Sequence, residues 1–222
     1  MNTAMNRDPS AFAVLLGGPL TVTDRLLAQL DGARVIAADG GMTHARTLGL
    51  TPELWVGDFD STPPALLAQW PDIPRQSHPA VKNETDGEIA TDAAIRRGAS
   101  RIIMAGALGG ERSDHVIFHL IHAFHLGAQG LDVLVTSGLE EAMPLKPGAN
   151  RFDLPAGSLF SILAFSSLSE LAITGARYPL EGVDLRFGTS RTVSNVAEGE
   201  VTVSLSHGTA FVLARPYDMS GT

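Results

Sequence analysis

Hydrophobic and polar positions in the first 137 residues follow two alternating patterns. Short apolar runs typical of strands are separated by segments in which apolar residues recur with the helical period. The strand-like runs are AFAVLLGG, RVIAADGG, LWVGDFDS, RIIMAGALGG and LDVLVTSG, and the helical segments include PPALLAQW, TDGEIATDAAIRRG and SDHVIFHLIHAFHLG. Strands and helices in this order predict an α/β domain with a mainly parallel sheet covered by helices.

The pattern changes after about residue 148. FDLPAGSLFSILAFSS, LSELAITGA, GVDLRFGT, GEVTVSLSHG and TAFVLARP are strand-like runs divided by Gly, Pro and Asn, and VTVSLS alternates clearly. These runs predict a C-terminal antiparallel β-sandwich. We therefore expect an α/β domain over residues 1–140 and a β-sandwich domain over residues 148–222, joined through the loop EEAMPLKPGAN.

Composition indicates the cellular compartment of the chain and argues against some classes of binding partner. The 222 residues include no cysteine, which excludes disulfides and thiolate metal sites. The N-terminus has no basic start followed by a long apolar core, and no segment approaches the roughly 20 apolar residues of a membrane span. A formal net charge of -8 argues against wrapping a polyanion such as DNA. We expect a cytoplasmic protein that binds neither a membrane nor nucleic acid.

Several strand-like runs end in Gly or Asp. Because ligands collect at the carboxyl ends of parallel strands, AADGG, VGDFDS and AGALGG are expected to face one crevice. In AADGG, the backbone N–H groups of Gly40 and Gly41 could meet an anion at the start of a helix, with Asp39 at the strand tip. The alternative is a tight turn in which Asp39 caps the helix.

The stretch VGDFDST places Asp58 and Asp60 one residue apart after an apolar run. Alternate side chains of an extended segment point to the same face, so these carboxylates repel each other unless a cation lies between them. Hard oxygen ligands at the mouth of a crevice suit Mg²⁺. The alternative is an acidic turn in which Asp60 or Ser61 caps a helix that begins near Pro63.

The segment KNETDGEIATDAAIRRG adds a third carboxylate. The helical period places Asp86 on the apolar face, whereas Glu88 and Asp92 turn to the opposite side with Arg96. Asp86 is therefore a candidate ligand, with Lys82 nearby to meet phosphate. The alternative is that Asp86 only interacts favourably with the helix dipole.

The segment AGALGGERSDH carries glycines for close backbone approach, Arg112 for an anion, and Asp114 at the start of the next helix. The alternative makes Ser113 or Asp114 a helix cap and Arg112 a surface residue.

A competing possibility is a histidine metal site. His115, His119 and His122 share one face of the helix HVIFHLIHAFH, but no HExxH motif is present and no carboxylate lies among them. A polar helix face is the favoured interpretation.

The motifs DGG, GDFDS, KxETDxExA and GGxRxDH, followed by GxxYPL, FGTSR and VSN in a β-rich tail, together resemble the thiamine pyrophosphokinases. The resemblance runs from the GG at residues 17 and 18 to VLA near the end of the chain. It implies a homodimer of two-domain subunits with active sites where the subunits meet. The implied reaction transfers the terminal diphosphate of ATP to the hydroxyl of thiamine and releases AMP, with Mg²⁺.

Matching positions carry the implied site residues onto this chain. The metal ligands would be Asp58, Asp60 and Asp86, and these three together with Asp114 would be the catalytic carboxylates. The residues lining the nucleotide would be Asp39, Gly40, Gly41, Ser61, Lys82, Thr85, Arg112 and Asp114. Thiamine would meet Ser194 and Asn195 and would stack its cationic ring on Tyr178. The alternative for Tyr178 is that it packs in a turn with Pro179.

The chain departs from the family pattern at four places. Asn83 stands where an aspartate is frequent, His119 where an asparagine is usual, and Val196 where a glutamate is frequent. The loop GGERSDH is one residue longer than the commoner form, so the match of Arg112 depends on how that loop closes.

A polyphosphate carried by Mg²⁺ would be the partner of the acidic pair, and catalysis would be mainly positioning and electrostatics. Asp114 or Asp86 would accept the hydroxyl proton. Two other classes stay open. A nucleotide-binding module would use the same crevice without turnover, and a metal phosphohydrolase would consume ATP at a rate indifferent to thiamine.

Overall fold

The computed structural model describes residues 8–60, 62–78 and 84–221, and the chain divides into two compact units, Met1–Gly138 and Leu139–Thr222. None of the described helices is both long enough and apolar enough to cross a membrane.

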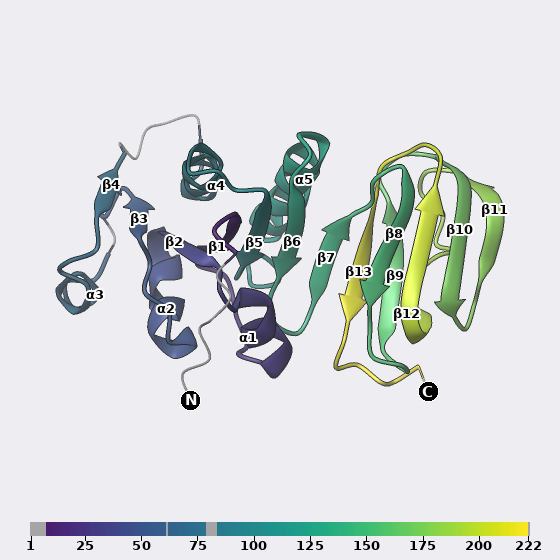
Figure 1. The fold of residues 1–222 in the computed structure, drawn as a ribbon, viewed down its shortest axis with the longest axis horizontal. Helices are drawn as coiled ribbons and strands as arrows, with labels where there is room; N and C mark the ends of the chain where they lie inside the picture. Colours follow the sequence, from purple (N-terminus) through teal and green to yellow (C-terminus); the bar gives the residue numbers. More distant parts are fainter. Residues whose placement is uncertain (1–7, 61, 79–83, 222) are drawn as a thin grey trace. The chain divides into compact units, whose positions relative to one another are not determined.

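The N-terminal unit is built on a six-stranded parallel sheet in the order β6-β5-β1-β2-β3-β4 (Figure 1). Its strands are β1 (Ala11–Leu15), β2 (Arg34–Ala38), β3 (Leu54–Gly57), β4 (Arg75–Ser77), β5 (Arg101–Ala105) and β6 (Asp132–Thr136). All five residues of β1 are buried, as are the last four of β2 and of β5. Strands covered on both faces need apolar side chains throughout, which explains why these runs do not alternate.

Helices connect these strands and cover the sheet. They are α1 (Asp24–Leu30), α2 (Met42–Leu48), α3 (Pro64–Gln69), α4 (Asp86–Arg96) and α5 (Ser113–Ala128), and a short 3₁₀ turn, η1 (Asp39–Gly41), leads into α2. Helices α4 and α5 lie on one side of the sheet and α1 and α2 on the other (Figure 1). Right-handed crossovers produce this arrangement because the chain reverses its direction across the sheet after β4.

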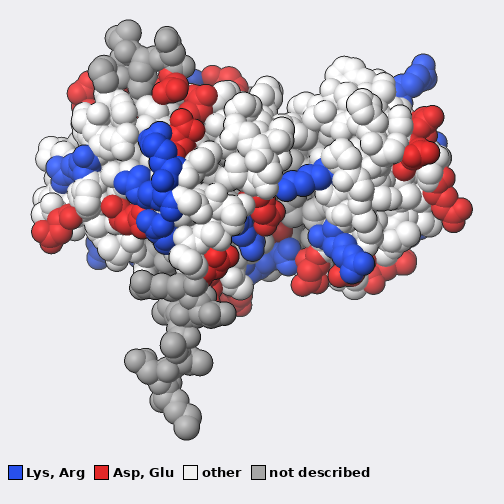
Figure 2. Space-filling view, turned by 45° about the horizontal axis from the view of Figure 1, so that its top comes forward, with Lys and Arg blue, Asp and Glu red and all other residues white. Residues whose placement is uncertain are grey.

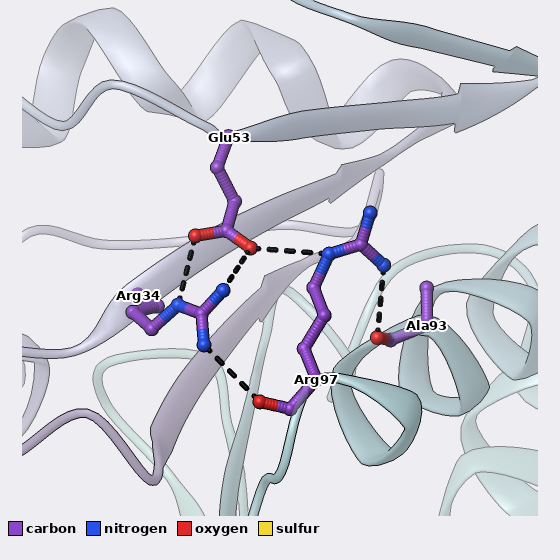
Figure 3. A network of polar contacts seen from close by, with 4 residues as sticks. All are labelled: Arg34, Glu53, Ala93 and Arg97. Atoms are coloured by element: carbon purple, nitrogen blue, oxygen red, sulfur yellow. Dashed lines mark hydrogen bonds and ion pairs between the residues drawn. The ribbon is translucent and has the colours of Figure 1, made fainter.

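An ion-pair network joins the amino ends of β2 and β3 to the end of α4 (Figure 3). Glu53 accepts hydrogen bonds of 2.9 and 2.8 Å from Arg34 and pairs with Arg97 at 3.3 Å. Arg34 also donates to the Arg97 carbonyl at 3.2 Å, and its guanidinium carbon lies 4.3 Å from the centre of the Phe12 ring. Figure 2 shows similar mixing of charge, with blue and red side chains lying side by side on one face of this unit. The network fixes the amino end of the sheet.

The C-terminal unit consists of antiparallel strands in two sheets that share β12. The strands are β7 (Glu141–Pro144), β8 (Gly148–Asp153), β9 (Leu159–Ala164), β10 (Leu168–Ala176), β11 (Leu180–Leu185), β12 (Asn195–Leu205) and β13 (Ala210–Arg215). The first two residues of β12 pair with β9, and later residues pair with β8 and β10. The sheets are therefore β11-β10-β12-β8 and β12-β9-β13-β7. Their buried side chains form one apolar core that includes Phe152, Phe160, Leu171 and Val203.

The predicted fold class is confirmed, and two elements differ from the expectation. Strand β4 has the sequence RQS and lies at the edge of the parallel sheet, so it carries no apolar signal. Strand β7 lies within the segment expected to be a connecting loop, where it pairs with β13 through Met143 and Val212. Because β7 is four residues long, its pattern is too short to distinguish from a loop.

Candidate active site

A cleft of about 1050 Å³ opens at the carboxyl ends of the parallel strands in the N-terminal unit. Its lining comes from the loops after β1 and β5, the turn after β2, and the first turns of α4 and α5. Strands β1 and β5 are neighbours in the sheet, and the chain reverses its direction between them. Ligands bind at such reversal points in open α/β sheets. The fold itself therefore positions this cleft as a binding site.

Most of the described candidate site residues of the N-terminal unit lie in this cleft. The lining includes Asp39, Gly40, Thr85, Asp86, Arg112 and Asp114. Gly41 is buried, and Gly41, Asp58 and Asp60 are not among the described lining residues. Ser61, Lys82 and Asn83 lie outside the described residues.

Glycines allow the segments around the cleft to pack backbone against backbone. A β-carbon on Gly41 would lie 2.0 Å from the carbonyl oxygen of Leu15, and one on Gly106 would lie 2.4 Å from that of Leu16. Gly106 also has a φ of 81°, in the left-handed region. By contrast, a β-carbon on Gly40 would meet only the Cα of Gly17, at 3.9 Å. The two glycines of the DGG motif therefore differ: Gly41 seats the turn on β1, and Gly40 faces the cleft.

Two strained residues follow neighbouring strands. Asp39, after β2, has a φ of 43°, and Phe59, after β3, has a φ of 63°. The buried Trp55 braces both, because its indole N–H donates to the Asp39 carbonyl at 3.0 Å and its ring meets Phe59 edge to face at 5.2 Å. Non-glycine residues with positive φ persist only where their surroundings hold them, and such positions concentrate at functional sites.

A hydrogen bond from backbone to side chain closes the Asp58–Asp60 turn. The N–H of Asp60 donates to Oδ1 of Asp58 at 3.1 Å. Helix α3 has Pro63 as its N-cap residue and no side-chain cap, so Asp60 does not cap it. The capping explanation therefore does not hold for Asp60, whose side chain is exposed.

Helix α4 presents Asp86 as the helical period predicts. Asp86 is partly buried and lines the cleft, whereas Asp92 and Arg96 are exposed. Glu88, on the other side of the helix, forms a capping box with Thr85. Thr85 N–H donates to Glu88 Oε2 at 2.7 Å, and Glu88 N–H donates to Thr85 Oγ1 at 3.2 Å. The spacing T-x-x-E is a sequence signal for this cap. The Thr85 hydroxyl thus fixes the start of the helix that carries Asp86.

Arg112 and Asp114 form a two-pronged ion pair at the mouth of the cleft. Arg112 Nε and Nη2 donate to the two carboxylate oxygens at 2.9 and 2.7 Å. The guanidinium holds the pKa of Asp114 well below its usual range, and the carboxylate raises the pKa of Arg112. Both side chains are about two-thirds exposed, so water screens the pair. Its main effect is to orient the arginine.

The histidines of α5 lie in different surroundings. His122 is buried and donates from Nε2 to Thr91 Oγ1 at 2.8 Å, because the Thr91 hydroxyl hydrogen is donated to the Glu88 carbonyl. No group of three His, Asp or Glu side chains within the described parts of the chain is placed to hold a metal ion. His115 and His119 instead line the cleft, together with His44 of α2.

In the C-terminal unit, Asn195 clamps the backbone of Tyr178. Its Oδ1 accepts from the Tyr178 N–H at 3.1 Å, and its Nδ2 donates to the Tyr178 carbonyl at 2.9 Å. Asn195 is 5% exposed, whereas Tyr178 is 61% exposed. The neighbouring Ser194 has a φ of 61°, and its N–H donates to Ser161 Oγ at 3.0 Å. The clamp leaves the tyrosine ring at the surface, where it can meet a ligand.

Two family models match the chain in order. The model described as "Thiamin pyrophosphokinase, catalytic domain" matches residues 28–135, and the model described as "Thiamin pyrophosphokinase, vitamin B1 binding domain" matches residues 150–209. The first match lies within the N-terminal unit and the second within the C-terminal unit.

Individual relatives agree with the family models. The thiamine pyrophosphokinase of Bacillus subtilis (strain 168) is 24% identical over 187 residues, which cover 82% of this chain and 87% of that protein. The crystal structure of thiamine pyrophosphokinase from Bacillus subtilis has a TM-score of 0.83 at 22% identity, covering 92% of this chain and 98% of its own. That of thiamin pyrophosphokinase from Geobacillus thermodenitrificans has a TM-score of 0.81 at 26% identity, covering 96% and 100%. The fold is therefore shared over nearly the whole length.

The different surroundings of the two DGG glycines generate a stability prediction. We expect Gly41→Ala to lower the free energy of unfolding by about 3 kcal/mol or more, because the new methyl group collides with backbone that cannot retreat. Gly40→Ala, the matched control, has room for the methyl group and should cost about 1 kcal/mol or less. Denaturant unfolding followed by circular dichroism measures both, and equal losses would contradict the packing described for Gly41.

Proposed function

Since this chain belongs to the thiamin pyrophosphokinase family, we propose that it transfers the terminal diphosphate of ATP to the hydroxyl of thiamine, giving thiamine diphosphate and AMP. The observation that carries the proposal is the match of both family models, in order, to the two units of the chain. The cleft at the reversal point of the parallel sheet supplies a nucleotide site within the catalytic part. Because ATP is the donor, we place the reaction in the cytoplasm.

The nucleotide would occupy the cleft of the N-terminal unit. Gly40 lines the cleft and offers a backbone N–H group to phosphate, and Arg112 offers a guanidinium already oriented by Asp114. Asp39 and Thr85 line the same space, while Gly41 keeps the turn in place. Ser61 and Lys82 remain proposed nucleotide contacts by resemblance alone.

The charges of the cleft favour a divalent cation. The described lining carries four carboxylates, from Asp39, Asp86, Glu111 and Asp114, against a single arginine, so a bare triphosphate would be repelled. Asp86 is the proposed ligand that lines the cleft, whereas Asp58 and Asp60 remain proposed ligands by resemblance alone, since the described parts of the chain bring no three acidic side chains together around a metal position. Carboxylate oxygens fit Mg²⁺, which needs only one or two carboxylates beside phosphate oxygens and water. When bound, Mg²⁺ would neutralise charge on the transferred diphosphate.

The proton of the thiamine hydroxyl needs an acceptor. Asp114 is poorly suited, because its pKa is lowered by the hydrogen bonds from Arg112 and the carboxylate is therefore a weak base. We assign Asp114 to orienting Arg112 and retain Asp86 as the candidate acceptor, through the carboxylate oxygen that would not hold the metal.

Thiamine binding is proposed for the C-terminal unit. The exposed ring of Tyr178 can stack on the cationic thiazolium ring. Asn195 would act by fixing the Tyr178 backbone, and Ser194 would present its hydroxyl beside it.

We also propose a homodimer with active sites where the subunits meet. Ile117 and Ile121, one turn apart on α5, are 54% and 52% exposed, on the helix that also carries Asp114 and His119 into the cleft. An apolar stripe of this kind suits contact with a second chain. Sedimentation velocity of the purified protein tests the dimer, and a monomer at micromolar concentration would contradict it.

The decisive experiment incubates the purified protein with MgATP, with and without thiamine, and separates the products by chromatography. The proposal requires AMP and thiamine diphosphate in equal amounts, formed only when thiamine is present. ADP released at a rate indifferent to thiamine would favour a phosphohydrolase, and no product at all would favour a nucleotide-binding module.

The same assay tests the role of Asp86. We expect Asp86→Asn to lower turnover by about 100-fold or more, because the cleft loses a carboxylate proposed to hold the metal and to accept the proton. Asp92→Asn is the matched control, since Asp92 lies on the exposed face of the same helix. Circular dichroism confirms folding, and full activity of a folded Asp86→Asn enzyme would refute the assignment.

The Tyr178→Ala variant should affect the KM for thiamine and not the KM for ATP. Loss of the stacking surface should raise the thiamine KM by about 5- to 30-fold and leave the ATP KM within about 2-fold. Tyr217→Ala removes the other tyrosine, which is 49% exposed, and should change neither value. Equal effects of Tyr178→Ala on both KM values would contradict a specific role in thiamine binding.

A further inference from the structure

His119 presents a defined hydrogen-bond acceptor to the cleft. The ring lies on α5, is partly buried, and lines the cleft beside Ala107 and Phe118. Its Nδ1 is 3.0 Å from the carbonyl oxygen of Ala107. A carbonyl only accepts, so Nδ1 carries the hydrogen, and in the neutral ring Nε2 keeps its lone pair. Burial lowers the pKa of His119 and so favours this neutral form.

No group in the described parts of the chain bonds to the Nε2 lone pair of His119. Nε2 is 4.0 Å from the position a β-carbon would take on Gly87, and the Thr85 hydroxyl is 3.8 Å from the same position. That hydroxyl is already committed, since it donates to Glu88 Oε2 at 3.1 Å. The acceptor is therefore left for a ligand.

The surroundings of Nε2 define the ligand chemistry. The side chains of Leu16, Ala107 and Phe118 give this part of the cleft apolar walls, with Leu16 Cδ2 only 3.1 Å from the β-carbon position on Gly87. A neutral acceptor between apolar walls repels phosphate oxygens, which carry no hydrogen to donate. It suits a flat or neutral group that brings an N–H or O–H donor.

We propose that Nε2 of His119 accepts a hydrogen bond from the nucleoside part of the nucleotide and thereby sets nucleotide preference. The donor is either the amino group of the base or a hydroxyl of the ribose. The inference deepens the proposed function, on which it rests for the identity of the ligand as a nucleotide. An asparagine, which the family resemblance puts at this position, offers the same pair of groups: an N–H for the Ala107 carbonyl and an oxygen acceptor for the ligand.

Equilibrium titration with four Mg-nucleotides, in the absence of thiamine, tests the inference. ATP is compared with ITP, which lacks the amino group, and with 2′-deoxy-ATP and 3′-deoxy-ATP, which each lack one ribose hydroxyl. In the wild type, the analogue that lacks the partner of His119 should bind about 3- to 10-fold more weakly than ATP. If ITP is the weaker ligand, the partner of His119 is the amino group of the base. If one of the deoxynucleotides is weaker, the partner is the ribose hydroxyl that it lacks.

Variants connect this preference to His119. His119→Phe and the smaller His119→Ala should weaken ATP binding and bring that analogue to within about 2-fold of ATP, because the acceptor is gone. His119→Asn should restore the wild-type ratio. His125→Asn is the matched control: it makes the same substitution at an exposed position of α5 outside the cleft, and it should leave all four affinities unchanged.

The decisive readout is the ratio between nucleotides. A merely structural role would weaken all four nucleotides equally and leave the wild-type ratios intact in His119→Phe and His119→Ala, which would overturn the inference. Equal binding of all four by the wild type would overturn it too. The titration contains no thiamine, so it measures nucleotide preference even if the chromatographic assay finds no diphosphate transfer. Failure of this inference and failure of the proposed function can therefore be told apart.

Discussion

Backbone segments at the carboxyl edge of the parallel sheet pack closer together than a β-carbon allows. Gly41 rests on the carbonyl of Leu15, and Gly106 rests on that of Leu16. Only glycine lets the turn after β2 and the loop after β5 both lie against the end of β1. The cleft depends on these contacts, because one of the two segments carries Asp39 and the other leads to Arg112.

Hydrogen bonds hold the functional side chains in place and occupy some of their donors and acceptors. The Thr85 hydroxyl is bonded within the helix cap, and Arg112 donates two hydrogen bonds to Asp114. In the C-terminal unit, the Asn195 side chain bonds to the backbone of Tyr178, the residue proposed to stack on thiamine. What remains available is specific: a largely acidic cleft that calls for a divalent cation, one oriented guanidinium, and an exposed aromatic ring. Such preorganisation suits a reaction whose catalysis is positioning and charge stabilisation.

The sequence predicts the structure well where one local period decides the outcome. The helical period placed Asp86 on the inner face of α4, and the order of apolar runs predicted the sheet and its carboxyl edge. Contacts between residues far apart in the chain are not predictable in this way. Nothing local shows that Asn195 bonds across 17 positions to Tyr178, or that His119 faces the cleft through its bond to Ala107. The polar edge strand β4 gives no local signal for a related reason, since only its pairing with β3 makes it a strand.

The central claim is that the carboxyl edge of the parallel sheet, at its reversal point, is the nucleotide site. Amide hydrogen exchange of the wild-type protein with and without MgATP tests it most directly. The account predicts slower exchange in the turn at residues 39–41, the loop at 106–112, and the first turns of α4 and α5. It predicts no change around the Arg34–Glu53 network at the amino edge. Protection at the amino edge, with none in the loops of the cleft, would contradict it.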